Sequence, residues 1–168
     1  MENQRRPMWF RAGLLVLLLG LSGCFRSSER DHLRRAEEFT RQNKFNDAIE
    51  TYRRHIAYRL SLKDRPDWEN PYFYLLIIGD LELRQESLDN ALSAFSEAEK
   101  KGVEAGLVSD RYRSLGTWLE KKGRLTEAIK LLSDFRDRDP LLFDAMLDRM
   151  AKDLTAQENA TPIATPLE

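Results

Sequence analysis

Residues 112–135 read YRSLGTWLEKKGRLTEAIKLLSDF, two helix-length segments joined by a short link that contains Gly123. Large apolar side chains recur three or four positions apart in both segments, which is the spacing of one buried face of an α-helix. Gly116 lies in the first segment and Ala128 in the second, so two helices could approach each other closely at these small residues. The stretch therefore predicts a pair of antiparallel helices.

The same pattern occurs three times along the chain. The copies align on Ala48, Ala91 and Ala128, and no gap is needed inside any copy. The other matching columns hold the small residues Ala36, Gly79 and Gly116, and the large residues Phe45, Leu88, Leu125, Tyr52, Phe95 and Leu132. Repeats of paired helices are typical of solenoids, in which each unit buries its apolar face against its neighbours.

The third copy resembles the tetratricopeptide repeat (TPR). It places Tyr112, Leu115, Gly116, Leu119, Gly123, Leu125, Ala128, Leu132, Phe135 and Pro140 at the spacing of that family's signature. The resemblance implies an all-α fold, a TPR-type α-solenoid of three helix-turn-helix hairpins plus a C-terminal capping helix. We expect a TPR-like domain over residues 32–154, with repeats at about 29–62, 70–102 and 107–140.

The chain after Pro140 predicts one more helix and then a tail. Apolar residues form a single stripe over residues 141–154, so this capping helix would cover the open face of the third hairpin. Residues 155–168 contain two Thr-Pro pairs and few large apolar side chains. We expect this segment to be a disordered tail, because it cannot bury enough surface to offset the entropy of ordering.

Two features of the second copy leave alternatives open. Trp68, in a long insertion before this copy, is either a partner anchor or, as we favour, a loop side chain packed on neighbouring helices. Asn70 and Pro71 then predict a helix start, as cap and first position. The apolar run over residues 72–78 is either buried, which we favour, or a groove for an apolar partner.

The N-terminus resembles that of a bacterial lipoprotein. Basic residues precede a short apolar core, and Leu21, Ser22 and Gly23 lead to Cys24 as in a lipobox. The resemblance implies a signal peptide over residues 1–23, a diacylglycerol and an N-acyl chain such as palmitate on Cys24, and a tether over residues 24–31. An ordinary secretory signal is the alternative. Because Phe25 replaces the aspartate that often signals inner-membrane retention, we expect the outer membrane facing the periplasm, with the outer leaflet of the inner membrane possible.

Composition argues against several function classes. Without residues 1–23 the chain would carry 24 basic and 27 acidic side chains, which does not favour nucleic acid. Cys24 is the single cysteine, so a disulfide framework or a thiolate metal site is not expected. The only histidines are His32 and His55, and no phosphate loop, nucleophile elbow or metal motif occurs. We therefore expect no enzyme, no catalytic or metal-binding residues, no cofactor and no small-molecule substrate.

The TPR resemblance also implies a partner-binding groove. In that family the first helix of each hairpin lines a concave face that receives a peptide segment or a helix of another protein. The corresponding residues here are Leu33, Glu37, Thr40, Arg41, Phe73, Leu76, Asp80, Leu83, Arg84, Arg113, Thr117 and Lys121. Asp80 and Thr117 stand where family members that clamp a terminal carboxylate carry asparagine, so we do not expect that binding mode.

Together these features predict a membrane-anchored scaffold or assembly factor of the bacterial envelope, which binds a protein partner through the concave face. The partner would be a peptide segment or helix of an envelope complex. The alternative is a permanent structural subunit of such a complex, in pilus, secretion or outer-membrane assembly machinery.

Overall fold

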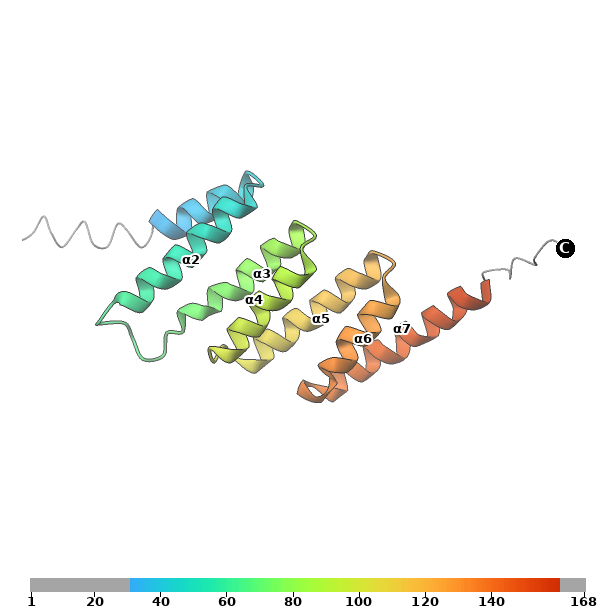
Figure 1. Ribbon diagram of the computed structural model, residues 1–168. Helices are drawn as coiled ribbons and strands as arrows, with labels where there is room; N and C mark the ends of the chain where they lie inside the picture. Colours follow the sequence, from blue (N-terminus) through green and yellow to red (C-terminus); the bar gives the residue numbers. More distant parts are fainter. Residues whose placement is uncertain (1–30, 161–168) are drawn as a thin grey trace, which may run out of the picture.

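The computed structural model describes residues 31–160, and these form antiparallel helical hairpins stacked side by side (Figure 1). No strand occurs within this range. The first helix covers residues 31–41 of the described chain. The remaining elements are α2 (Phe45–Ser61), η1 (Pro71–Phe73), α3 (Tyr74–Arg84), α4 (Leu88–Lys100), α5 (Ala105–Lys121), α6 (Leu125–Asp134), η2 (Arg136–Arg138) and α7 (Pro140–Ala160). The three predicted hairpins and the additional C-terminal helix are therefore confirmed.

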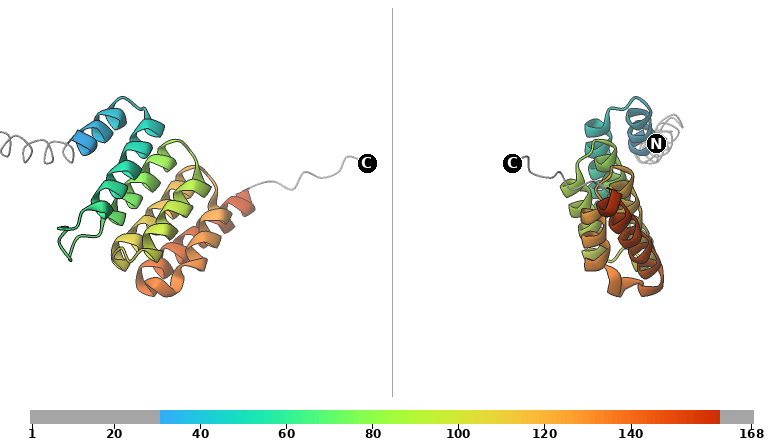
Figure 2. Two further views of the ribbon diagram at one scale, coloured as in Figure 1. Left: turned by 60° about the vertical axis from the view of Figure 1, so that its left-hand side comes forward. Right: turned by 90° about the vertical axis from the view of Figure 1, so that its right-hand side faces the viewer.

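The hairpins lie in two layers. The first helices, which are residues 31–41, α3 and α5, form one layer together with α7, and the second helices α2, α4 and α6 form the other (Figures 1 and 2). The core between the layers holds large side chains that are almost fully buried, including Leu75, Phe95, Tyr112, Leu115 and Phe143. Each hairpin thus shares its apolar interior with the next one.

Small residues set the approach of the two helices in a hairpin, as the sequence predicts. A Cβ atom built on Gly79 of α3 would lie 2.7 Å from ring atoms of Phe95 on α4. One built on Gly116 of α5 would lie 2.8 Å from Leu132 Cδ2 on α6. Both distances are shorter than van der Waals contact, so a side chain at either position would require the facing residue to move.

The three hairpin turns share one backbone arrangement. Asn43, Glu86 and Gly123 have φ values of 57°, 61° and 73°, the left-handed conformation that commonly ends a helix. The amide after each of them donates to a carbonyl five residues earlier, over 2.9 Å in all three turns. The turns therefore close in the same way although their sequences differ.

The insertion before the second hairpin forms a loop braced at both ends. Asn70 accepts a hydrogen bond from the Tyr72 amide over 3.1 Å, and Pro71 occupies the first helical position, which confirms the predicted helix start. At the other end, Arg59 near the end of α2 forms a two-pronged ion pair with Glu69, with 2.6 Å between Arg59 Nε and Glu69 Oε1.

The capping helix is longer than expected. We predicted 141–154, whereas α7 runs from Pro140 to Ala160, so the expectation of a disordered tail was wrong for residues 155–160. Residues 155–159 are exposed, but an existing helix extends by one hydrogen bond per added residue, and Ala, Gln and Glu favour that extension. The rest of the predicted tail, residues 161–168, lies outside the described residues. The same holds for the predicted signal peptide, Cys24 and all of the tether except Asp31.

Candidate functional site

The candidate site is the first-helix face, which we define as the surface of residues 31–41, α3 and α5 that points away from α2, α4 and α6. Of the predicted groove residues, Glu37, Arg41, Phe73, Arg84 and Lys121 are exposed, and Leu33, Thr40, Asp80, Leu83, Arg113 and Thr117 are partly buried. Eleven of the twelve side chains therefore keep some accessible surface.

Leu76 is the exception, and its assignment to the groove was wrong. Its side chain is 0% exposed and belongs to the core, as do the flanking Leu75 and Ile78. The apolar run over residues 72–78 is thus mainly core, which agrees with the interpretation that we favoured. Phe73, at 40% exposure, is the member of the run that reaches the surface most clearly.

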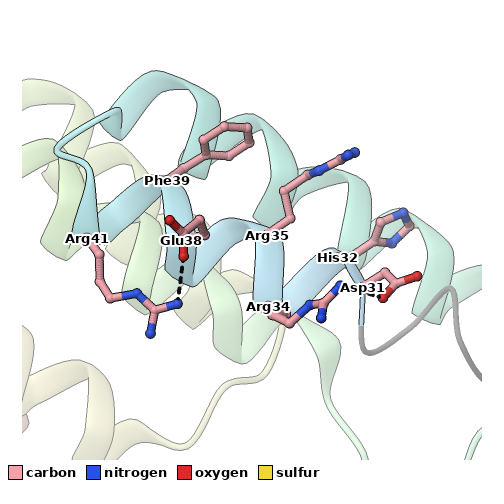
Figure 3. A pocket seen from close by; sticks show the side chains of 7 residues that line it. All are labelled: Asp31, His32, Arg34, Arg35, Glu38, Phe39 and Arg41. Carbon is pink, nitrogen blue, oxygen red and sulfur yellow. Dashed lines mark hydrogen bonds and ion pairs between the residues drawn. The ribbon is translucent and has the colours of Figure 1, made fainter.

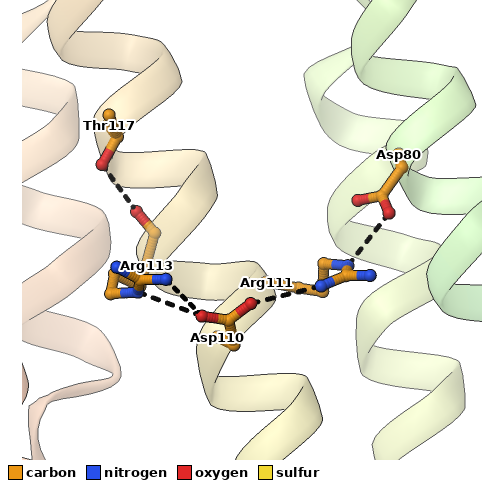
Figure 4. A network of polar contacts seen from close by, with 5 residues as sticks. All are labelled: Asp80, Asp110, Arg111, Arg113 and Thr117. Atoms are coloured by element: carbon orange, nitrogen blue, oxygen red, sulfur yellow. Dashed lines mark hydrogen bonds and ion pairs between the residues drawn. The ribbon is translucent and has the colours of Figure 1, made fainter.

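A charged network links α3 and α5 at the centre of this face (Figure 4). Arg111 lies between two carboxylates, with 3.0 Å from its Nε to Asp80 Oδ2 and 3.2 Å from its Nη1 to Asp110 Oδ2. Arg113 also donates to Asp110, with 3.1 Å from Nε to Oδ1. The network therefore joins two hairpins and contains two acidic and two basic groups.

Burial and charge act in opposite directions on Asp80. Desolvation raises the pKa of this carboxyl above its ordinary value, and the guanidinium of Arg111 partly opposes that rise. The Nε of Arg111 is buried and lies close to Asp80, but the angle between the two groups does not suit a hydrogen bond. The contact is therefore an ion pair. Asp80 is thus held by one cation at a site where its charge is partly desolvated.

Sequence reasoning identified only half of this network. It named Asp80 and Arg113 but missed Asp110 and Arg111. Asp110 stands in α5 where Phe73 stands before α3, so the repeat alignment offered a signal for it. Arg111 aligns with Tyr74, which is partly buried beside aromatic rings, so nothing in the alignment pointed to a charged bridge.

Several of the remaining polar groups of the face are also engaged within the protein. Thr40 and Thr117 donate their hydroxyls to carbonyls four residues earlier, over 2.9 and 3.2 Å. Arg84 reaches the first hairpin, where its guanidinium lies 4.6 Å from the centre of the Phe45 ring. These contacts hold the side chains in place and leave the carbonyl-facing hydroxyls able to accept a further hydrogen bond.

Two of the pockets that lie away from this network include predicted groove residues. One is an open hollow whose described lining comes from residues 31–41 alone, with Arg41 and Glu38 paired over 2.9 Å (Figure 3). The other lies around the loop before α3 and includes Trp68 and Phe73. Trp68 is 85% exposed, so our preferred interpretation of it as a side chain packed on neighbouring helices was wrong.

The two histidines belong to an aromatic cluster between the first helix and α2. The ring centres of His32 and His55 lie 6.4 Å apart with nearly perpendicular planes, and Tyr58 and Tyr74 pack beside them. Over residues 31–160, no group of three or more His, Cys, Asp or Glu side chains is placed to hold a metal ion. Nor does any helix in that range have the length and apolar content needed to cross a membrane.

Comparison with known proteins identifies the fold. No family model matches the sequence, and no curated protein is detectably similar to it. Among solved structures, the TPR2AB domain of yeast Sti1 in complex with pHSP90 is similar, with a TM-score of 0.54 and 20% sequence identity. The match covers 79% of this chain and 49% of the Sti1 chain, so this protein spans about half the length of that chain. The fold is therefore a TPR-type α-solenoid.

Proposed function

We propose that this protein is a non-enzymatic, membrane-anchored scaffold of the bacterial envelope, which binds a protein partner on the first-helix face. The observation that carries this proposal is the network of Asp80, Asp110, Arg111 and Arg113 across two hairpins. Its side chains are between 25% and 43% exposed, so a partner can reach them, yet they are already held by one another. Such preorganisation reduces the entropy that binding would otherwise cost.

The chemistry of the face indicates the kind of partner. Acidic and basic groups are balanced and lie within hydrogen-bond distance of one another, which suits a partner segment carrying both charges and polar groups. A strongly charged ligand of one sign would have to separate these pairs. The occupant that we propose is a helix or an extended peptide of an envelope protein, lying across α3 and α5.

The anchor that we propose is the acylated thiol and amine of Cys24. Two or three acyl chains give stable membrane attachment, whereas one chain is marginal. Metabolic labelling with an alkyne fatty acid, followed by mass spectrometry of the mature N-terminus, tests this part. We expect label on the wild type and none on Cys24→Ser. An unlabelled wild type with an intact N-terminus would remove the anchor from the proposal.

Photo-crosslinking in living cells tests the binding face. A photoreactive amino acid at Arg84, Thr117 or Lys121 should yield a discrete crosslinked product. The same amino acid at Glu50 on α2 or Lys130 on α6, both exposed on the second-helix layer, provides the matched control. We expect no product from the control positions. Equal crosslinking from both layers would contradict a binding face on the first helices.

A second experiment, on the partner that crosslinking identifies, distinguishes a scaffold from a permanent subunit. The crosslinked protein is identified, purified and mixed with this chain, and the complex is then diluted. A scaffold that releases its partner will exchange labelled for unlabelled chain. A complex that stays stoichiometric without exchange would favour the structural-subunit alternative.

A further inference from the structure

Large exposed apolar side chains gather at one edge of the stack. Over residues 31–160 there are five of them, and all lie at or near the links between successive hairpins: Leu60, Trp68, Phe73, Leu107 and Leu141. We call this the connection edge, formed by the ends of α2, α4 and α6, the links that follow them, and the starts of α3, α5 and α7. Leu141 and Trp68 are 91% and 85% exposed, so neither is packed against the part of the chain that the structure describes.

The opposite edge, formed by the hairpin turns, has a different character. Its turns cover residues 42–44, 85–87 and 122–124 and contain only polar or charged residues and one glycine. Trp118 lies near this edge, partly buried, with the charged groups of Lys122 and Arg124 over its ring at 5.6 and 5.9 Å. Among residues 31–160, the large and clearly exposed apolar side chains are therefore confined to the connection edge.

The N-terminal chain enters the fold on the side of the connection edge. Residues 31–41 run in the same direction as α3, α5 and α7, so their start points toward this edge (Figure 1). The His32 ring lies 5.7 Å from that of Tyr58, which is within one turn of the end of α2. Cys24 stands seven residues before Asp31, and a chain of that length spans at most about 25 Å.

We propose that the connection edge rests on the surface of the lipid bilayer, with Trp68 and Leu141 inserted at the level of the headgroups. This inference rests on the lipid anchor of the proposed function. An acylated Cys24 would keep the edge within reach of the bilayer, and tryptophan is enriched at membrane interfaces because its ring is apolar and its N–H is polar. Because Trp68 and Leu141 lie near opposite ends of the connection edge, the bilayer would contact the edge along its length.

The charges beside Trp68 indicate what kind of bilayer suffices. Lys63 and Arg65 alternate there with Asp64 and Asp67, so the local charge is balanced. Attraction to anionic lipid is therefore not required, and we expect contact with zwitterionic phosphatidylcholine.

The native tryptophans provide a direct test. The chain has three, of which Trp9 lies in the predicted signal peptide, so residues 24–168 keep Trp68 on the connection edge and Trp118 near the opposite one. Every helix of the described fold lies inside residues 24–168. Because Cys24 is the single cysteine, this chain can be coupled through it to a maleimide lipid in phosphatidylcholine vesicles that contain lipid brominated near the headgroup.

Two single-tryptophan variants then report the two edges. Trp118→Phe leaves Trp68, whose emission should shift to shorter wavelength and lose most of its intensity to the brominated lipid. Trp68→Phe leaves Trp118, which should keep its intensity. A third reporter, Leu141→Trp with both native tryptophans changed to Phe, should be quenched like Trp68. Circular dichroism of each variant verifies that the helices are intact.

Several outcomes would overturn the inference. The first is an unquenched Trp68, and the second is equal quenching of Trp68 and Trp118. The third is an emission shift of Trp68 that depends on the density of protein on the vesicles, since this would indicate a second copy on the connection edge. Because the coupling is chemical, the result does not depend on whether cells acylate Cys24. If the proposed lipid anchor is wrong, the fatty-acid labelling of wild type and Cys24→Ser will show it. If the proposed membrane contact of the connection edge is wrong, the tryptophan quenching will show it.

Discussion

The glycine in the first helix of the second hairpin is where a single methyl group should matter most. In Gly79→Ala the new Cβ would overlap the ring of Phe95, which is 0% exposed and rigid. Overpacking of this kind costs about 1–3 kcal/mol and exceeds the gain of about 1 kcal/mol from replacing a helical glycine by alanine. We expect a net loss of up to about 2 kcal/mol in the free energy of unfolding, measured by urea denaturation.

Two other glycines calibrate that measurement. Gly116→Ala meets the flexible end of Leu132, so its loss should be smaller than that of Gly79→Ala. Gly106→Ala, near the start of α5, has an ordinary 3.9 Å distance to Glu104 Oε1 and should be neutral or stabilising. Equal effects at all three positions would show that helix propensity, and not the fit between helices, determines the outcome.

The ion pair between Arg59 and Glu69 should make stability depend on pH. Their side chains are only 12% and 18% exposed, and the hydrogen bonds from Arg59 hold the pKa of Glu69 below its ordinary value of 4.5. A lowered carboxyl pKa stabilises the fold above the ordinary value, and this stabilisation is lost as the pH falls through the lowered one. Glu69→Gln should therefore cost about 1–2 kcal/mol at neutral pH.

The difference between this variant and wild type should shrink as the pH falls through the lowered pKa of Glu69, because protonation then leaves an uncharged side chain at this position in both proteins. A series of urea midpoints from neutral to acid pH measures the change. Glu50→Gln, which breaks the exposed pair with Arg54 on the same helix, is the control and should leave the midpoint almost unchanged. A loss at Glu69 that persists in acid would mean that packing of the loop, and not the charge, is responsible.

At the scale of whole helices, the repeat pattern was the most informative part of the sequence. Small and large residues at fixed spacing predicted all three hairpins. Residue size alone indicates where two helices approach closely, as they do at Gly79 and Gly116. The end of α7 and the role of Leu76 were mispredicted for different reasons. Residues 155–159 are helical although they are exposed, and Leu76 is fully buried on α3, which packs against both α2 and α4.

The candidate site was less predictable than the fold. Family spacing identified which face of the first helices remains accessible, but the bridge made by Arg111 depends on how α3 and α5 lie beside each other. Likewise, Trp68 was interpreted as packed because loop tryptophans usually are, whereas it is 85% exposed and the contacts that brace its loop are made by the neighbouring residues Glu69 and Asn70.

Truncation separates the two parts of α7. Phe143 and Met150 are 0% exposed against the rest of the fold, and fully burying such a side chain contributes about 1.5–3 kcal/mol. A chain ending at Asp139 should therefore lose several kcal/mol of stability, about the sum of these two contributions. We also expect it to aggregate. A chain ending at Leu154 removes the last turns of α7, where residues 155–159 are all exposed, and should keep the wild-type urea midpoint. Similar losses from both truncations would show that the last turns of α7 stabilise the cap.

At the scale of the whole molecule, the two proposed surfaces are compatible. The connection edge runs along the ends of the helices, whereas the first-helix face runs along their sides, so contact with a bilayer would leave the face open. A 17-residue helix such as α5 is about 25 Å long, so the polar hairpin turns would stand roughly that far above the membrane. A partner on this face would then lie beside the bilayer at a fixed height.

The bridge between the second and third hairpins gives the last prediction. Among the described residues, Arg111 is the only cation paired with Asp80, whereas Asp110 is also held by Arg113. Arg111→Met should therefore leave Asp80 partly buried without its cation and raise the pKa of that carboxyl further above 3.8. A raised carboxyl pKa costs stability when the group is charged, and the cost disappears as the pH falls through the raised value. We expect a loss of about 1 kcal/mol at pH 7, because the pair is partly exposed, and almost none near pH 3. Arg113→Met should lose less stability at pH 7, since it leaves the ion pair between Asp80 and Arg111 intact. A loss of stability in Arg111→Met that does not depend on pH would show that the two hairpins are joined by packing and not by this ion pair.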